Sequence, residues 1–211
     1  MKNNNLEKLK QIYWGIKDKI EARLNEFSEV WINGNDADIF AELVFCILTP
    51  QSKAKSCWKA VKSLIEKNLL FNGDKNQIAK ELNGVRFQNN KSRYIIEARK
   101  KYIKSLKFLK SDIDTLVRRE WLARNIKGFG YKEASHFLRN IGFGEDLAIL
   151  DRHILKNLKL LKLIDEIPKV LSKKKYLEIE ERMKKFSEDV KIPMSHLDLV
   201  WWYKETGKVF K

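Results

Sequence analysis

The chain of 211 residues carries 43 Lys and Arg against 28 Asp and Glu, a formal net charge of +15, and 44% of its residues are hydrophobic. This composition fits one or two folded domains and excludes a disordered chain, and the lack of any run of 18 apolar residues excludes a membrane-spanning helix. The positive charge predicts a polyanionic partner, nucleic acid first and an anionic membrane surface second. With only 9 Gly and 3 Pro and few β-branched alternations, the chain is predicted to be all-α.

Hydrophobic spacing predicts a series of amphipathic helices in the first half of the chain. They cover residues 6–27, 39–48, 53–68, 77–82 and 92–109. The helix over 39–48 is apolar on nearly every face, so it is predicted to lie at the centre of the fold. Cys46 and Cys57 form no metal-binding pattern and are predicted to be buried free thiols.

Two further helices are predicted from the apolar stripes at 116–122 and 134–141, with the tight turn Asn-Ile-Lys-Gly-Phe-Gly-Tyr-Lys at 125–132 between them. Gly128 and Gly130 let the backbone bend sharply and approach a ligand closely. The amides that open the second helix suit an anion such as a phosphate. This pattern predicts a helix–hairpin–helix that holds a DNA backbone. Lys132 lies where the helix dipole disfavours a cation, so it is either an ordinary surface lysine or a functional one.

Asp151 interrupts the apolar run 147–155 and is predicted to cap a helix that begins at Arg152. Helices over 173–190 and 196–203 follow, the last with Ser195 as its N-cap and Asp198 in the first turn. Asp198 and Trp202 are four residues apart and share a helix face. A carboxylate beside a flat ring is one way to hold guanine, and the alternative is a capping aspartate with a core tryptophan.

The chain resembles the helix–hairpin–helix DNA glycosylases in the segment from Ile126 to Lys132 and in the 19-residue spacing between Lys132 and Asp151. In the bifunctional members, the lysine at this position is the nucleophile and the aspartate is its partner, so the resemblance implies catalytic roles for Lys132 and Asp151. The chain departs from the family pattern before the acid, where Ile149-Leu150 replaces the usual Gly-Pro or Val. No cysteine follows Cys57, which excludes the C-terminal four-cysteine iron–sulfur cluster of some members.

Over its whole length the chain resembles the second, archaeal and bacterial family of 8-oxoguanine DNA glycosylase/AP lyases. The shared features are the small size, Phe-Cys-Ile-Leu-Thr-Pro-Gln-Ser at 45–52, the loop with Phe87, Lys132, Asp151 and a C-terminal lysine. The resemblance implies that Phe87 and Trp202 sandwich the base and that Asp198 contacts it. It also implies that the carboxylate of Lys211 enters the base pocket, provided that the chain ends there.

The loop at 48–52 also resembles the superfamily, in which a glutamine at this place fills the gap left by a flipped base. Gln51 is therefore expected to act as the wedge, with Ser52 beside it at the DNA, and a simple helix-capping loop is the alternative. Phe87, flanked by polar residues, is expected either to stack on a base or to belong to the core.

The resemblance implies two helical subdomains with the hairpin at the cleft between them: residues 28–125 in one, 126–132 at the seam, and 1–27 with 133–211 in the other. The implied activity is removal of 8-oxoguanine from double-stranded DNA and strand cleavage by β-elimination through a lysine Schiff base. No cofactor and no catalytic metal are expected. A cytoplasmic monomer without a membrane partner is expected.

Three other functions remain open from the sequence. The same fold could act on another damaged or mispaired base. A non-catalytic helix–hairpin–helix protein would bind DNA in a salt-dependent way, and a Lys132→Gln change would leave that binding intact. A basic protein of the membrane surface would bind anionic liposomes.

Overall fold

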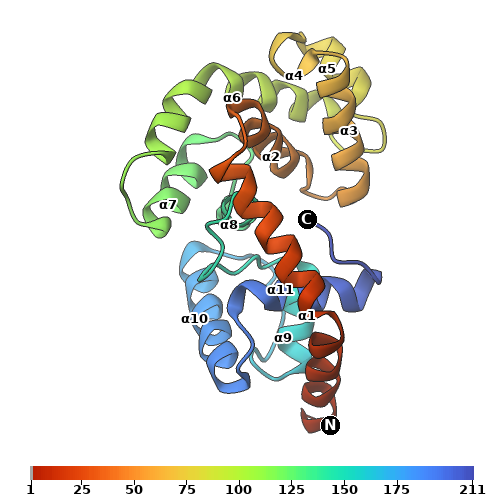
Figure 1. Cartoon of the computed structure of the whole chain (residues 1–211), viewed down its shortest axis with the longest axis vertical. Coiled ribbons are helices and arrows are strands. Elements are labelled where there is room, and N and C mark those ends of the chain that lie inside the picture. The colour runs from red at the N-terminus through yellow and green to blue at the C-terminus, as the bar shows by residue number, and fades with distance from the viewer. Residues whose placement is uncertain (1) are drawn as a thin grey trace.

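The computed structural model describes residues 2–211, with side chains from Asn4 onward, and its regular structure within that range consists of helices alone. The all-α prediction is confirmed. The helices are α1 (Lys2–Ile32), α2 (Asp36–Leu48), α3 (Ala54–Glu66), α4 (Leu69–Asn72), α5 (Lys75–Glu81), α6 (Gln88–Leu109), α7 (Thr115–Asn125), α8 (Tyr131–Asn140), α9 (Arg152–Leu160), α10 (Lys173–Val190) and α11 (Met194–Thr206). Figure 1 shows an upper lobe with α2 to α7, a lower lobe with α9 to α11, and α1 running between them.

Helix α2 forms the centre of the upper lobe, as its apolar sequence predicts. Asn35 caps it with a capping box, in which the Asn35 side chain accepts from the Asp38 amide and the Asp38 carboxylate accepts from the Asn35 amide. Every residue from Ile39 to Leu48 is buried, and the thiols of Cys46 and Cys57 are free and buried as predicted. No helix within residues 2–211 is long and apolar enough to cross a bilayer.

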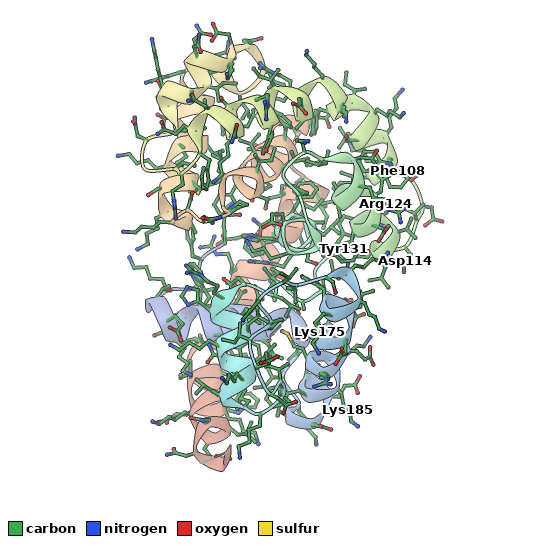
Figure 2. All side chains as sticks on the ribbon, turned by 180° about the vertical axis from the view of Figure 1, so that it is seen from behind. Phe108, Asp114, Arg124, Tyr131, Lys175 and Lys185 are labelled. Carbon is green, nitrogen blue, oxygen red and sulfur yellow. The ribbon has the colours of Figure 1, made fainter. Side chains whose placement is uncertain are left out.

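The buried apolar side chains form two clusters, one in each lobe. The first extends from Ile39 to Leu147 and includes the buried face of α8, and the second joins the start of α1 to residues between Ala148 and Trp201. Tyr131, at the start of α8, lies between the lobes in the rear view of Figure 2 and packs on Tyr176 of the second cluster. Helix α8 therefore joins the two cores. The subdomain limits stay a prediction, and the change of core falls between Leu147 and Ala148.

Several observed helix boundaries differ from the predicted ones. Helix α1 ends at Ile32, beyond the predicted end at residue 27, and α6 begins at Gln88, before the predicted start at residue 92. The short α4 lies in a segment for which no helix was predicted, because four residues are too few to show a period. Helix α11 begins at Met194 after Pro193, so Ser195 lies inside the first turn and is not the N-cap.

The apolar pattern predicted that Leu116 and Val117 of α7 face the core, but both are exposed. Arginines occupy the inner face of this helix instead. The Arg118 guanidinium is buried because it donates to the carbonyls of Leu109, Ser111 and Ile113. Arg119 is buried against α10, where its Nη1 lies 2.5 Å from Glu180 Oε1. Hydrogen bonds thus allow charged side chains to take core positions.

We predict that Arg119→Met lowers the free energy of unfolding by about 3–5 kcal/mol, because it leaves the Glu180 carboxylate buried without its partner. Arg124→Met is the matched control, because Arg124 pairs with Glu120 at the surface, where such pairs contribute about 0–1 kcal/mol. Urea unfolding followed by circular dichroism measures both variants. Equal losses would contradict a structural role for the buried pair.

Candidate active site

The turn between α7 and α8 is tight and requires a glycine at position 128. Gly128 has φ +89°, and a Cβ built there would lie 2.8 Å from Cδ2 of Tyr94. The amide of Gly130 donates to Oε2 of Glu133 at 3.1 Å, which caps the start of α8 with a carboxylate. The end of α8 that the sequence assigned to a DNA phosphate therefore binds an anionic group of the chain itself in this structure.

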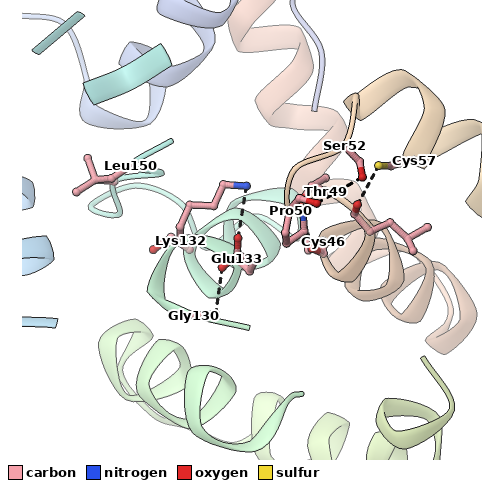
Figure 3. A network of polar contacts seen from close by, with 12 residues as sticks. Cys46, Thr49, Pro50, Ser52, Cys57, Gly130, Lys132, Glu133 and Leu150 are labelled. Carbon is pink, nitrogen blue, oxygen red and sulfur yellow. Dashed lines mark hydrogen bonds and ion pairs between the residues drawn. The ribbon is translucent and has the colours of Figure 1, made fainter. Parts of the chain in front are cut away.

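Lys132 extends from the first turn of α8 toward the space between the lobes (Figure 3). Its side chain is 21% exposed, and its Nζ lies 3.8 Å from Oε1 of Glu133. This is a long ion pair, so the amine is free to turn toward a ligand. Lys132 lines both a small pocket and the larger cleft beside it.

Asp151 is the N-cap of α9, as predicted, and its Oδ1 accepts from the Ile154 amide at 2.8 Å. The strand-like segment before it is fixed by α10. The Ala148 amide donates to Oε1 of Glu180 at 2.8 Å, and the Tyr176 hydroxyl donates to the Ala148 carbonyl at 2.5 Å. Because these bonds hold Ala148 and the helix cap holds Asp151 itself, the Asp151 carboxylate has a defined direction, and it lines the same pocket as Lys132.

This pocket has a volume of about 90 Å³ and is built from four segments that are distant in the sequence. It lies beside a cleft of about 920 Å³. Thr49, Ser52, Ala54, Lys132, Asp151 and Trp202 line both spaces. Among the predicted site residues, the pocket brings together Ser52, Lys132, Asp151, Asp198, Trp202 and Lys211.

Gln51 and Phe87, like Gly128 and Gly130 of the hairpin, lie outside the pocket. Gln51 lines the larger cleft from the loop after α2. Phe87 precedes α6 with φ 62° and is 51% exposed, so the core alternative is excluded for its ring. Its ring lies under the Arg86 guanidinium at 5.3 Å and borders a separate hollow, not the pocket with Trp202. The expected sandwich of Phe87 and Trp202 is therefore not closed in this structure.

Two adjacent tryptophans of α11 have different environments. Trp201 is buried in the second cluster, whereas the neighbouring Trp202 is partly exposed and faces the pocket. Asp198 is buried, and its Oδ2 lies 3.3 Å from Nη2 of Arg139. Burial raises the pKa of the Asp198 carboxyl, and the Arg139 charge opposes that shift. The acid is thus held by an ion pair, not by a helix cap.

Lys211 reaches back across the pocket to the upper lobe. Its ammonium pairs with the buried Glu42 of α2 and lies 3.6 Å from the ring centroid of Trp58. Burial lowers the pKa of Lys211, and Glu42 opposes that shift. The other Glu42 oxygen, Oε2, accepts from the Asn140 amide at 2.8 Å. These contacts fix the end of the described chain against α2.

Three polar residues of this region were not predicted from the sequence: Glu42, His136 and Arg139. His136 and Arg139 follow Lys132 by four and seven residues, which is a helical spacing that could have placed them on its face. Glu42 is the one acid within the apolar run 39–48, which was also a usable signal. Burial, together with the charges of Lys132 and Arg139, holds the pKa of His136 well below its usual range, so this imidazole is uncharged.

The arrangement offers the groups needed for covalent chemistry on a sugar carbon. A lysine amine can attack an electrophilic carbon and form an imine, and a nearby carboxylate can stabilise positive charge that develops there. Trp202 gives a flat face on which an aromatic ring could stack.

Comparison with known proteins gives one consistent family. The family model described as 8-oxoguanine DNA glycosylase matches residues 20–192. A Fusobacterium nucleatum protein named 8-oxoguanine DNA glycosylase/AP lyase is 51% identical and covers 100% of this chain and 99% of its own length. The crystal structure of the Thermotoga maritima 8-oxoguanine DNA glycosylase has a TM-score of 0.91 and 38% identity, with complete coverage of both chains.

A second solved structure includes a substrate. It is the Methanocaldococcus jannaschii 8-oxoguanine glycosylase/lyase in complex with a 15mer DNA containing 8-oxoguanine. Its TM-score to this chain is 0.89 and its identity is 41%, and the match covers 98% of this chain and 99% of that one. The chain therefore belongs to the 8-oxoguanine DNA glycosylase family.

Proposed function

We propose that this protein removes 8-oxoguanine from double-stranded DNA and then cleaves the strand at the resulting abasic site. The observation that carries the proposal is that Lys132 and Asp151 line one pocket with Trp202 and Lys211. Family membership and the activity for which its relatives are named agree with it.

The target nucleotide must leave the helix before the pocket can hold its base, at a cost of about a few kcal/mol. The net charge of +15 attracts the duplex, and the glycine turn at Gly128 and Gly130 contacts its backbone. Gln51, at the rim of the cleft, enters the space that the flipped base leaves, with Ser52 beside it.

Base removal starts when the Lys132 amine, in its neutral form, attacks C1′ of the flipped nucleotide. A bond forms between Nζ and C1′ while the bond from C1′ to the base breaks, and the base departs with a proton. Asp151 stabilises the positive charge that develops on the sugar and assists loss of the amine proton. Its Oδ1 is bound to the Ile154 amide, so Oδ2 is the oxygen left for this task.

Strand cleavage follows from the same covalent bond. The sugar ring opens at its oxygen to give an imine between Lys132 and C1′. Loss of a C2′ proton then expels the 3′ phosphate by β-elimination, and water releases the lysine. Side chains of this protein and water suffice for these steps, and none of them requires a cofactor.

Trp202, Phe87, Asp198 and Lys211 recognise the base. Trp202 stacks on one face of the base, and Phe87 reaches the other face when the lobes move together on DNA. Asp198 and Lys211 supply polar contacts to the base edge. The ammonium of Lys211 is paired with Glu42, and the residue lines the pocket.

We predict that Asp151→Asn lowers the single-turnover rate of 8-oxoguanine release by about 100-fold or more, because it removes the charge that stabilises the transition state. Asparagine caps a helix about as well as aspartate, so the fold should be kept. Asp114→Asn, at the cap of α7, is the matched control and should retain full activity.

The assay uses a duplex with one 8-oxoguanine and the same duplex with guanine. Release of the oxidised base alone by the unchanged protein supports the proposed function. Release from neither duplex, or full activity of Asp151→Asn, would contradict it.

We predict that Trp202→Leu lowers kcat/KM for 8-oxoguanine release by about 10- to 100-fold, because stacking on one base contributes about 1–3 kcal/mol. Cleavage at a preformed abasic site should be unchanged, since no base is present to stack. The exposed Trp14 of α1 provides the control Trp14→Leu, for which both rates should stay normal. An equal fall on the two substrates would count against a base-stacking role for Trp202.

A further inference from the structure

Lys91 is a buried lysine without a buried acid to pair with. It lies in the first turn of α6 and is 4% exposed. Its ammonium donates to the carbonyls of Leu48 and Pro50, each at 2.7 Å, and to Oγ of Ser52 at 3.0 Å. Within residues 2–211, no carboxylate forms an ion pair with it. Three oxygen acceptors thus use the three N–H donors of the ammonium.

The acceptors of Lys91 belong to the last residue of α2 and to the loop that follows it, and they lie on both sides of Gln51. Gln51 itself has φ 55°, a left-handed conformation that costs a residue other than glycine about 1–2 kcal/mol. Ser52 Oγ also accepts from the Arg86 amide at 3.0 Å, and the Cys57 thiol donates to the Leu48 carbonyl (Figure 3). The loop is thus tied to α3 and α6 around one strained residue that lines the cleft.

A buried lysine at this position costs free energy of folding. Burial lowers the pKa of Lys91 to about 8, which shows that the charged form loses much of its hydration. Apolar side chains of similar size generally fill such a space at lower cost. The carbonyls of Leu48 and Pro50 would then be buried without donors, and the loop would be free to leave its strained conformation.

We propose that Lys91 is a positioning residue that holds the 49–52 loop in the shape that presents Gln51 to the duplex. This inference rests on the proposed function, in which Gln51 fills the space of the flipped base. Lys91 touches neither the pocket nor the substrate, so it acts through the loop alone. Its contribution should therefore appear only where a base must be extracted from a duplex.

The test compares 8-oxoguanine release from a duplex with release from a single-stranded oligonucleotide of the same sequence. Lys91→Met removes the ammonium and keeps an unbranched side chain. The duplex rate should fall about 10- to 100-fold, as expected when a functional group is misplaced by about 1 Å. The single-strand rate should stay within about twofold, because no partner base has to be replaced.

The ratio of the two rates is measured on one preparation, so partial unfolding does not change it. Gln51→Ala should shift the ratio in the same way. The double variant should have the same ratio as the more affected single variant, because both changes remove the same function, the insertion of Gln51 into the duplex. Lys104→Met, on the exposed face of the same helix, is the control for loss of a positive charge.

Equal losses on both substrates, or additive losses in the double variant, would overturn the positioning role and leave Lys91 a structural residue. These outcomes differ from failure of the proposed function, in which the unchanged protein would release the base from neither substrate.

Discussion

The candidate active site depends on one short segment of backbone, residues 148–150, which α10 holds in place. The Tyr176 hydroxyl and the Glu180 carboxylate bind the two sides of Ala148, and Arg119 forms a buried ion pair with Glu180. Asp151 follows directly and starts α9. If this segment moved, the carboxylate would no longer face the pocket that Lys132 enters from α8. The two cores are thus joined through α8 and this segment, and the proposed catalytic pair, Lys132 and Asp151, is divided between them.

Some charged groups at the pocket form buried ion pairs, whereas Lys132 and Asp151 do not. Two buried pairs stand at its wall, Arg139 with Asp198 and Lys211 with Glu42. Each pair satisfies a charge that would be costly to bury alone. Lys132 has only a long contact to Glu133, and Asp151 binds a backbone amide. The two side chains that the proposed reaction requires therefore lie outside these buried ion pairs.

The sequence predicted the elements with clear periodicity and the site residues that carry a motif. The helical class, the central position of α2, the glycine turn and the cap at Asp151 follow from local patterns, which act over a few residues. The buried arginines of α7, the pairing of Asp198 and the tie from Lys91 depend on partners far along the chain, and no local pattern encodes them. Trp202 was selected by its four-residue offset from Asp198 and by resemblance, and packing then shows that the adjacent Trp201 is the buried one.

The most direct test of the account is covalent trapping of the enzyme on DNA. The protein is incubated with a duplex carrying one 8-oxoguanine, the imine is reduced with borohydride, and the modified peptide is identified by mass spectrometry. The account predicts one adduct, on the peptide that contains Lys132, and none with Lys132→Gln although that variant still binds DNA. An adduct on another lysine, or base release without any adduct, would contradict it.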